Sequence, residues 1–153
     1  MGKATKPKTA FPRHRARRAA LQALYAHMMS GESDPEKLFN DVIAVNKELR
    51  KEVYPFLKKL ITSAIEREKF ADEIIREVTE NWELERIAAI DRNILRLGIA
   101  EFLDFPDISP RVTIDEAIEL AKEFGDQDSS KFVNGVLDAA LRKLRQLGLV
   151  TKD

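Results

Sequence analysis

Residues 112–144 read VTIDEAIELAKEFGDQDSSKFVNGVLDAALRKL, and this stretch decides the fold class. Its apolar residues recur every three or four positions, which is the spacing of one buried helix face. The second half carries the longest such series, which consists of Phe132, Val133, Val136, Leu137, Ala140, Leu141 and Leu144. The stretch therefore predicts two consecutive amphipathic helices.

Capping residues mark the ends of these two helices. Residues 113–116 run from Thr to Glu with the spacing of a capping box, so we expect the first helix to begin there and to end at Phe124-Gly125. The second helix is expected to begin at Asp126 or Asp128, either of which is a good N-cap. It is expected to stop at Gly148.

The same spacing predicts five further helices upstream. Asp34-Pro35-Glu36 is a start signal, because aspartate caps a helix and proline suits its first position. Pro55 is expected in the first turn of another helix, since a deeper proline would break it. Residues 104–110 hold two prolines and are predicted to be a loop that excludes helix. No segment alternates convincingly with a period of two, so we expect an all-α fold of seven helices, the other three at about residues 13–30, 70–80 and 84–103.

The composition narrows the class of protein. Of the 153 residues, 44% are hydrophobic, which allows a substantial core. There is no cysteine, which excludes disulfides and thiolate chemistry, and no run of about 18 apolar residues that could span a membrane. His14 and His27 have no partner at metal-ligand spacing, and no phosphate loop or nucleophile motif is present. We therefore expect a soluble cytoplasmic protein that is not an enzyme, with no catalytic residue, no metal and no cofactor.

The net charge of zero hides a basic N-terminal region. Residues 1–31 contain seven lysines and arginines and no acidic residue. We expect residues 1–12 to form a disordered basic tail, followed by a helix that opens with Arg13, Arg15, Arg17 and Arg18. Cations at a helix N-terminus oppose the helix dipole at about 0.3–1 kcal/mol each, so the cluster predicts an external anion that offsets this. A nucleic acid is favoured over an acidic protein partner or a merely solvated tail.

RNA is favoured over duplex DNA as the partner, because no helix-turn-helix frames a recognition helix and arginine-rich segments often become ordered on RNA. Phe132 is a candidate stacking residue, although the residues alone favour a place in the core for it. Asn134 and Gly135 are poor helix formers within the last predicted helix. We expect close helix packing at Gly135 and a capping or inter-helix hydrogen bond from Asn134.

Four blocks of the sequence together resemble the NusB family. The blocks are RRAALQALY at residues 17–25, DRNILRL at 91–97, VTIDEAIELAKEFG at 112–125 and KFVNGVLD at 131–138. Trp82 also stands where the family often has a tryptophan. The resemblance covers essentially residues 13–145 and implies a seven-helix fold. It implies one domain of residues 13–148, with packed subdomains of about 13–68 and 69–148.

The resemblance also implies a function and its partners. The implied function is support of antitermination by RNA polymerase through binding of the boxA element, as single-stranded RNA, in ribosomal RNA operon transcripts. The implied protein partner is the small-subunit ribosomal protein NusE, with which the chain would form a heterodimer. Carried over to this chain, the RNA-binding residues are Arg13, Arg15, Arg17, Arg18, Gln22, Asp128, Lys131 and Phe132. The residues carried over to the partner surface are Tyr25 and Asp91, the second of which is glutamate in some relatives.

Two alternatives remain open from the sequence. Some RNA methyltransferases carry a NusB-like targeting module, of which this chain would then be a fragment. A helical scaffold that binds an acidic protein through its basic arm would explain the charge without RNA. The resemblance also leaves room for a homodimer that buries the RNA-binding face.

Overall fold

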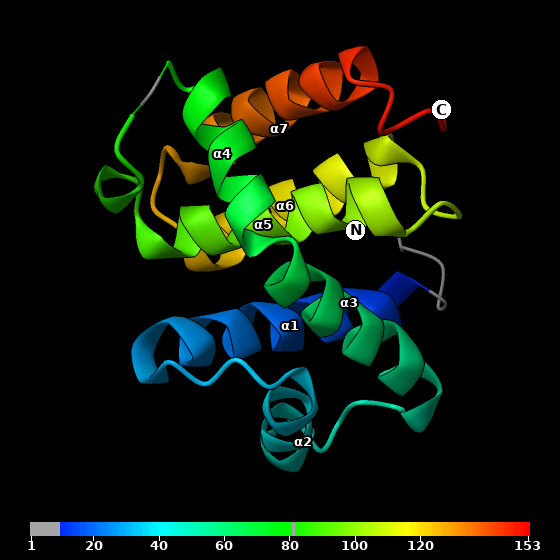
Figure 1. Ribbon diagram of the computed structural model, residues 1–153. Coiled ribbons are helices and arrows are strands. Elements are labelled where there is room, and N and C mark those ends of the chain that lie inside the picture. The colour runs from blue at the N-terminus through cyan, green and yellow to red at the C-terminus, as the bar shows by residue number, and fades with distance from the viewer. Residues whose placement is uncertain (1–9, 81) are drawn as a thin grey trace, which may run out of the picture. The chain divides into compact units, whose positions relative to one another are not determined.

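The computed structural model describes residues 10–80 and 82–153 and consists of helices joined by short turns (Figure 1). The described residues contain no strand, so the predicted all-α class is confirmed. The chain divides into two compact units, Met1–Thr62 and Ser63–Asp153. The seven α-helices are α1 (Ala10–Ser30), α2 (Pro35–Val45), α3 (Tyr54–Glu66), α4 (Glu68–Val78), α5 (Ala89–Asp104), α6 (Pro110–Phe124) and α7 (Ser129–Gln146). Two short 3-10 helices, η1 (Lys51–Val53) and η2 (Leu84–Arg86), precede α3 and α5.

The first unit is built on α1, which packs against α2 and η1. Small side chains on the buried face of α1, such as Ala16 and Ala20, have no exposed surface and allow close approach of its neighbours. The larger core residues come from α1, α2 and α3 and are Leu24, Leu38, Val42, Leu57, Leu60 and Ile61. Pro55 is the second residue of α3, so the prediction that it lies in the first turn is confirmed.

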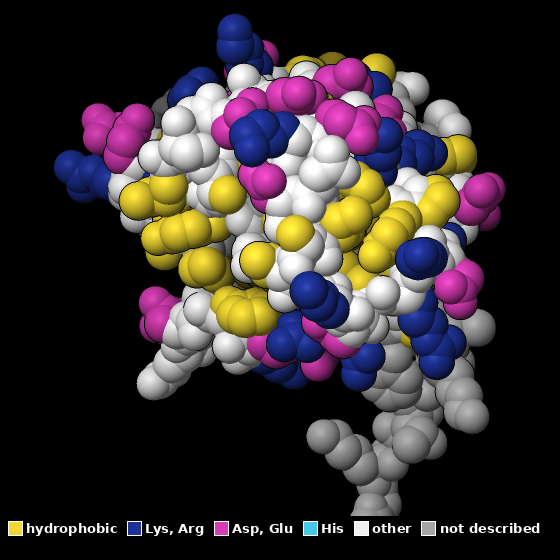
Figure 2. Space-filling view, turned by 90° about the horizontal axis from the view of Figure 1, so that it is seen from below, with side chains coloured by type: hydrophobic (Ala, Val, Ile, Leu, Met, Phe, Trp, Pro, Cys, Tyr) yellow, Lys and Arg dark blue, Asp and Glu magenta, His cyan; other side chains and the backbone are white. Residues whose placement is uncertain are grey.

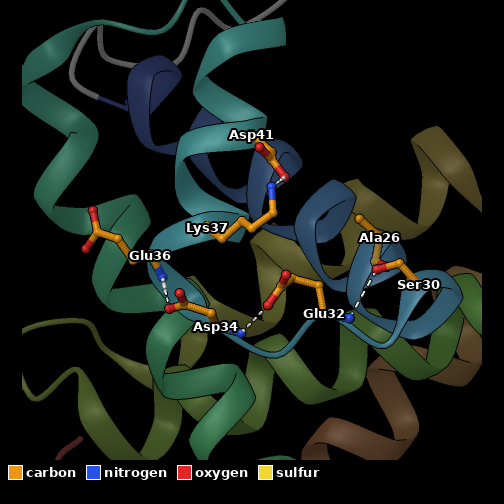
Figure 3. A network of polar contacts seen from close by, with 7 residues as sticks. All are labelled: Ala26, Ser30, Glu32, Asp34, Glu36, Lys37 and Asp41. Carbon is orange, nitrogen blue, oxygen red and sulfur yellow. Dashed lines mark hydrogen bonds and ion pairs between the residues drawn. The ribbon is translucent and has the colours of Figure 1, made fainter.

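The turn from α1 to α2 is held by a chain of local hydrogen bonds (Figure 3). The Ser30 hydroxyl donates to the Ala26 carbonyl oxygen at 2.7 Å and accepts from the Glu32 amide at 3.1 Å. The Glu32 carboxylate accepts from the Asp34 amide, and the Asp34 carboxylate accepts from the Glu36 amide at 3.0 Å. Asp34 is thus the N-cap of α2, as its sequence context predicted.

The second unit surrounds α5, which contacts α4, α6 and α7. Helix α5 is buried on nearly every side, and Ile94, Leu95 and Ile99 have no exposed surface. Gly98 lets α7 come close, because a Cβ atom there would lie 2.8 Å from Cδ2 of Leu137. Helix α5 therefore lies in the centre of the second unit, although it also buries the polar residues Asn93, Arg96 and Glu101.

A charged network joins α4 to α5 inside this unit. The Arg96 guanidinium donates two hydrogen bonds to the Asp72 carboxylate, both at 2.8 Å. It also donates to the Asn93 side-chain oxygen at 3.2 Å and lies 3.5 Å from Glu68. Because only 9% of the Arg96 side chain is exposed, its charge depends on these partners.

The C-terminal residues cap the C-terminal end of α5, a role that was not predicted for them. Val150 is buried. The Lys152 ammonium donates to the carbonyl oxygens of Glu101 at 3.0 Å and Phe105 at 2.6 Å. A lysine at this end of a helix satisfies carbonyl oxygens there and complements the negative end of the helix dipole. Burial lowers the pKa of the Lys152 ammonium, and the nearby Glu101 carboxylate opposes this shift.

Two predicted helix starts in the second unit were wrong. Helix α6 begins at Pro110, with Ser109 as the N-cap that accepts from the Val112 amide, so residues 113–116 are not a capping box. A proline at the first helical position gives up no hydrogen bond, which is why Pro110 starts the helix instead of excluding it. Thr113 lies inside α6, where its buried hydroxyl donates to the Glu101 carboxylate at 2.9 Å. Helix α5 begins at Ala89 and not near Leu84, since Ile87 is extended after η2.

The explanation predicted for Asn134 and Gly135 was also wrong. Both residues are exposed on α7, and a Cβ atom at Gly135 would meet nothing within 4 Å. Close packing of α7 is needed at Gly98 of α5, for which no role had been predicted.

Among the described residues, no helix has both the length and the apolar character of a membrane span.

Candidate nucleic-acid interface

The arginines of α1 do not lie at the opening of the helix. The helix begins at Ala10, which places Arg13 fourth in the helix and Arg17 and Arg18 more than a turn further on. The influence of the helix dipole falls off within the first turn. The predicted dipole penalty for a cluster of four arginines is therefore wrong, and these residues must be judged by their surroundings. Lysines 3, 6 and 8 and most of the predicted tail lie outside the described residues.

Arg13 and Arg17 share one side of α1 and face the same aromatic ring. The guanidinium carbon of Arg13 lies 4.7 Å from the centroid of the Phe56 ring, and that of Arg17 lies 5.1 Å away. Arg13 remains exposed, whereas only 4% of Arg17 is accessible. Cations over an aromatic face are attracted by its quadrupole, so Arg17 has a packing role within the first unit.

Arg15, Arg18, Gln22 and Tyr25 form a different stripe, which we call the α1 stripe. They are spaced by three, four and three residues, so they follow one another along one face of the helix. All four side chains are exposed. Asn46, at the C-cap of α2, donates to the Gln22 side-chain oxygen at 2.9 Å and so fixes its orientation. The stripe offers two guanidinium groups, an amide and a phenol ring to a partner.

A second group of predicted residues lies where α7 begins. Asp128 is the N-cap residue of α7, Lys131 is exposed and Phe132 is half-buried. Trp82, from the connector between α4 and η2, stacks on Phe132 with ring centroids 6.1 Å apart and an angle of 22°. We call Asp128, Lys131, Phe132 and Trp82 the α7 cluster.

The turn before α7 is held tightly. The Ser129 hydroxyl accepts from the Asp126 amide at 3.0 Å, and the Asp126 carboxylate accepts from the Asp128 amide at 2.9 Å. A Cβ atom at Gly125 would lie 2.4 Å from Cβ and Oγ of Ser129, so only glycine fits there. These contacts set the direction in which α7 leaves the turn.

Asp91 lies beneath this turn and not on the open surface. Only 7% of the residue is accessible, and its Oδ1 atom has no hydrogen-bond partner. Burial raises the pKa of the Asp91 carboxyl, contact with Ser129 lowers it, and the negative charge of Asp126 raises it further. Of the two predicted partner-facing residues, Tyr25 is therefore exposed and Asp91 is not.

Seven of the ten predicted site residues thus fall into two groups, one in each unit, and Arg13, Arg17 and Asp91 belong to neither group. The α1 stripe belongs to the first unit and the α7 cluster to the second. On the face shown in Figure 2, lysine and arginine side chains are interspersed with acidic and hydrophobic ones, so this face has no uniform basic field. Trp82 was not predicted as a site residue, although two signals were available: it stands where the NusB family often has a tryptophan, and it is a large aromatic residue among polar neighbours.

The fold and these two surface groups define an all-α protein with cationic and aromatic groups suited to a polyanionic partner. The chain belongs to the NusB family, whose model matches residues 14–142. A protein named transcription antitermination protein NusB from Bacillus thuringiensis is 40% identical over 125 residues, covering 82% of this chain and 93% of the relative. One of the same name from Chloroherpeton thalassium is 38% identical over 140 residues, covering 92% of this chain and 66% of the relative.

Solved structures of the family have the same fold. T. maritima NusB is 34% identical, with a TM-score of 0.78 over 92% of this chain and 94% of that chain. A structure described as the antitermination factors NusB and NusE in complex with dsRNA contains a chain that is 32% identical. It superposes with a TM-score of 0.77 over 86% of this chain and 97% of that one. The resemblance stated from the sequence blocks is confirmed.

Proposed function

We propose that this chain is a transcription antitermination factor that binds boxA-type RNA of ribosomal RNA operon transcripts. It acts with NusE as a heterodimer and supports antitermination by RNA polymerase. The observation that carries the proposal is the likeness, over nearly its whole length, to a NusB chain solved with NusE and RNA. The relatives named as antitermination proteins support the same function.

The α1 stripe supplies the phosphate contacts in this proposal. Arg15 and Arg18 are exposed, and a guanidinium group matches a phosphate with paired hydrogen bonds. Arg13 is also exposed and adds a third cation beside the Phe56 ring. Arg17 is buried, so we assign it to packing and not to RNA. Lys3, Lys6 and Lys8 of the predicted basic tail would add further charge ahead of these residues.

Three residues of the α7 cluster supply contacts to the bases. Phe132 offers aromatic surface, Lys131 a cation and Asp128 a hydrogen-bond acceptor. Single-stranded RNA is recognised through such stacking and edge contacts. We further propose that residues 13–148 act as one domain with subdomains of about 13–68 and 69–148.

NusE is proposed to contact the exposed end of the α1 stripe. Tyr25 is 45% accessible and Met29, one turn further on, is 67% accessible. Apolar and aromatic surface next to a polar stripe is typical of a protein interface. Asp91 is buried in the second unit, so it would affect a protein partner only by supporting the turn before α7.

The proposed adaptor is not an enzyme and works in the cytoplasm, where transcripts are made. The alternative of a methyltransferase targeting module is not favoured, because the alignment spans 93% of the Bacillus antitermination protein. A direct RNA-binding measurement distinguishes the proposed adaptor from the alternative of a scaffold that binds only proteins.

The test is binding of fluorescent boxA-like RNA over a series of salt concentrations, with and without NusE. Affinity falls as salt rises, and each lost phosphate contact makes the plot of log affinity against log salt less steep, by about 0.7 for single strands. The Arg15→Ala, Arg18→Ala double variant should therefore lower the slope by about 1.4. Arg142→Ala is the control, because Arg142 is also an exposed arginine but lies on α7, outside both groups of site residues.

Two results would contradict the proposal. Failure of the wild-type chain to bind boxA-like RNA, alone or with NusE, would favour the protein scaffold. An unchanged salt slope in the double variant would remove the α1 stripe from the interface. Because the related complex contains double-stranded RNA, the assay includes a duplex of the same sequence. Tighter binding of the duplex would contradict the single-stranded part of the proposal.

A further inference from the structure

Trp82 and Phe132 form an aromatic pair whose outer member has no role in the function proposed from the family resemblance. The two rings are nearly parallel, with 6.1 Å between their centroids, which is the range of offset stacking. Phe132 is half-buried at the fourth position of α7, and Trp82 lies on its ring. Trp82 itself is 54% accessible. The aromatic surface presented to a partner here therefore belongs mainly to Trp82.

We infer that Trp82 is an RNA-stacking residue, and that an unpaired base of single-stranded RNA stacks on the exposed face of its indole ring, extending the Phe132–Trp82 stack. This inference rests on the proposed RNA-binding function and adds a contact residue to it. Phe132 acts as the positioning residue, since it holds the indole ring from below. An indole ring that is already stacked loses little freedom when a base is added, which favours binding.

The charges around the Phe132–Trp82 pair favour one side of it for the RNA backbone. Lys131 is exposed on α7 next to Phe132, whereas the connector and η2 carry the exposed carboxylates of Glu83 and Glu85. Arg86 lies 3.6 Å from Glu83, so its charge is partly balanced. Phosphates are attracted to lysine and repelled by the carboxylates. The base therefore lies over Trp82 with its backbone on the side of Lys131.

A purely structural role for Trp82 makes a different prediction. A tryptophan that served only to cover Phe132 would stabilise the second unit and leave RNA affinity unchanged once the fold was intact. A stacking residue affects binding to any single strand, because every base has a π face. The affinity for boxA-like RNA and for an unrelated single strand should therefore fall by a similar factor when the ring is removed.

The test uses the fact that Trp82 is the single tryptophan of the chain. The full chain is titrated with dye-labelled boxA-like RNA, and two signals are followed: anisotropy of the dye and fluorescence of Trp82. Stacking should quench the indole emission in parallel with the anisotropy change. A duplex of the same sequence, whose bases are paired, should not quench it.

Variants of Trp82 distinguish loss of the stacking contact from loss of the fold. Trp82→Ala should weaken binding by roughly 5-fold to 150-fold, the range for loss of one stacked base, and Trp82→Phe should retain most of the affinity. Leu147→Ala is the matched control, because Leu147 is also 50% exposed but lies at the opposite end of α7. Circular dichroism and thermal unfolding check that each variant keeps its helices.

Each outcome decides the inference. Binding of wild-type chain without quenching would overturn it and leave the proposed function standing, as would unchanged affinity of a folded Trp82→Ala variant. An equal loss in a folded Trp82→Phe variant would also overturn it, because a phenyl ring still stacks. Absence of any RNA binding by the wild-type chain would overturn both the inference and the proposed function.

Discussion

Arg96 of α5 and Asp72 of α4 form a two-pronged ion pair, with both nitrogen–oxygen distances at 2.8 Å. The arginine is nearly buried and the aspartate side chain is 17% exposed, so water screens the pair weakly. Glu68 and Asn93 add to the same guanidinium. The pair fixes the register between α4 and the central helix of the second unit.

Asp72→Ala should lower the free energy of unfolding by about 3 kcal/mol, because it leaves the buried Arg96 guanidinium with only its weaker partners, Glu68 and Asn93. Urea unfolding followed by circular dichroism measures the change. Lys37→Ala is the control, since Lys37 and Asp41 form an exposed pair that contributes less than about 1 kcal/mol. A loss at Asp72 no larger than that of the control would show that the pair does not hold α4 in place.

Gly98 and Gly135 should respond in opposite directions to replacement by alanine. At Gly98 the new methyl group would lie 2.8 Å from Leu137, whose side chain is fully buried and has no room to move, so we expect a loss of about 1–3 kcal/mol. At Gly135 it would meet nothing, and a mid-helix alanine should gain about 1 kcal/mol. Thermal and urea unfolding of the two alanine variants check both predictions. A gain at Gly98 or a loss at Gly135 would contradict the packing described for α7.

Asp91→Asn should stabilise the protein near neutral pH. Burial raises the folded-state pKa of Asp91 above its ordinary value of 3.8, so the folded state holds this proton more tightly than the unfolded state. Stability from this group is therefore present at low pH and is lost as the pH rises from about 3.8 through the folded pKa. The amide that replaces the carboxyl group stays neutral at every pH, so the variant avoids that loss.

The measurement is the unfolding free energy of wild type and Asp91→Asn at a series of pH values. The difference between them should be small in strong acid and grow toward neutral pH. Asp107→Asn is the control, because Asp107 is exposed in the loop between α5 and α6. A difference that does not change with pH would show that the Asp91 carboxyl is not the titrating group.

Local signals in the sequence were reliable where the physical cause was also local. Asp34 and Pro35 start α2 as predicted, because a cap and a first-position proline need only their neighbours. Gly125 ends α6 for a similar reason. The same reasoning failed at Thr113, whose hydroxyl is bound by Glu101 of another helix. Nothing near Thr113 in the sequence indicates that partner.

The candidate site shows the same limit. Four arginines within six residues suggest one cluster, yet Phe56, which lies on another helix, draws Arg13 and Arg17 to one side. Family resemblance supplied Phe132, which periodicity alone had placed in the core. It did not supply Trp82 as a contact, because only the folded connector brings that ring onto Phe132.

Arg17→Met and Arg15→Met should separate the packing role of one arginine from the proposed RNA role of the other. Arg17 is 4% accessible and lies over Phe56, so Arg17→Met should lower the melting temperature and leave the salt slope of RNA binding unchanged. Arg15 is exposed on the α1 stripe, so Arg15→Met should leave the melting temperature unchanged and lower the slope by about 0.7. Methionine keeps the apolar stem in both cases, so charge is the main difference. If both variants lowered the slope equally, Arg17 would also reach the RNA, and the division of the α1 arginines into a packing side and a binding side would be wrong.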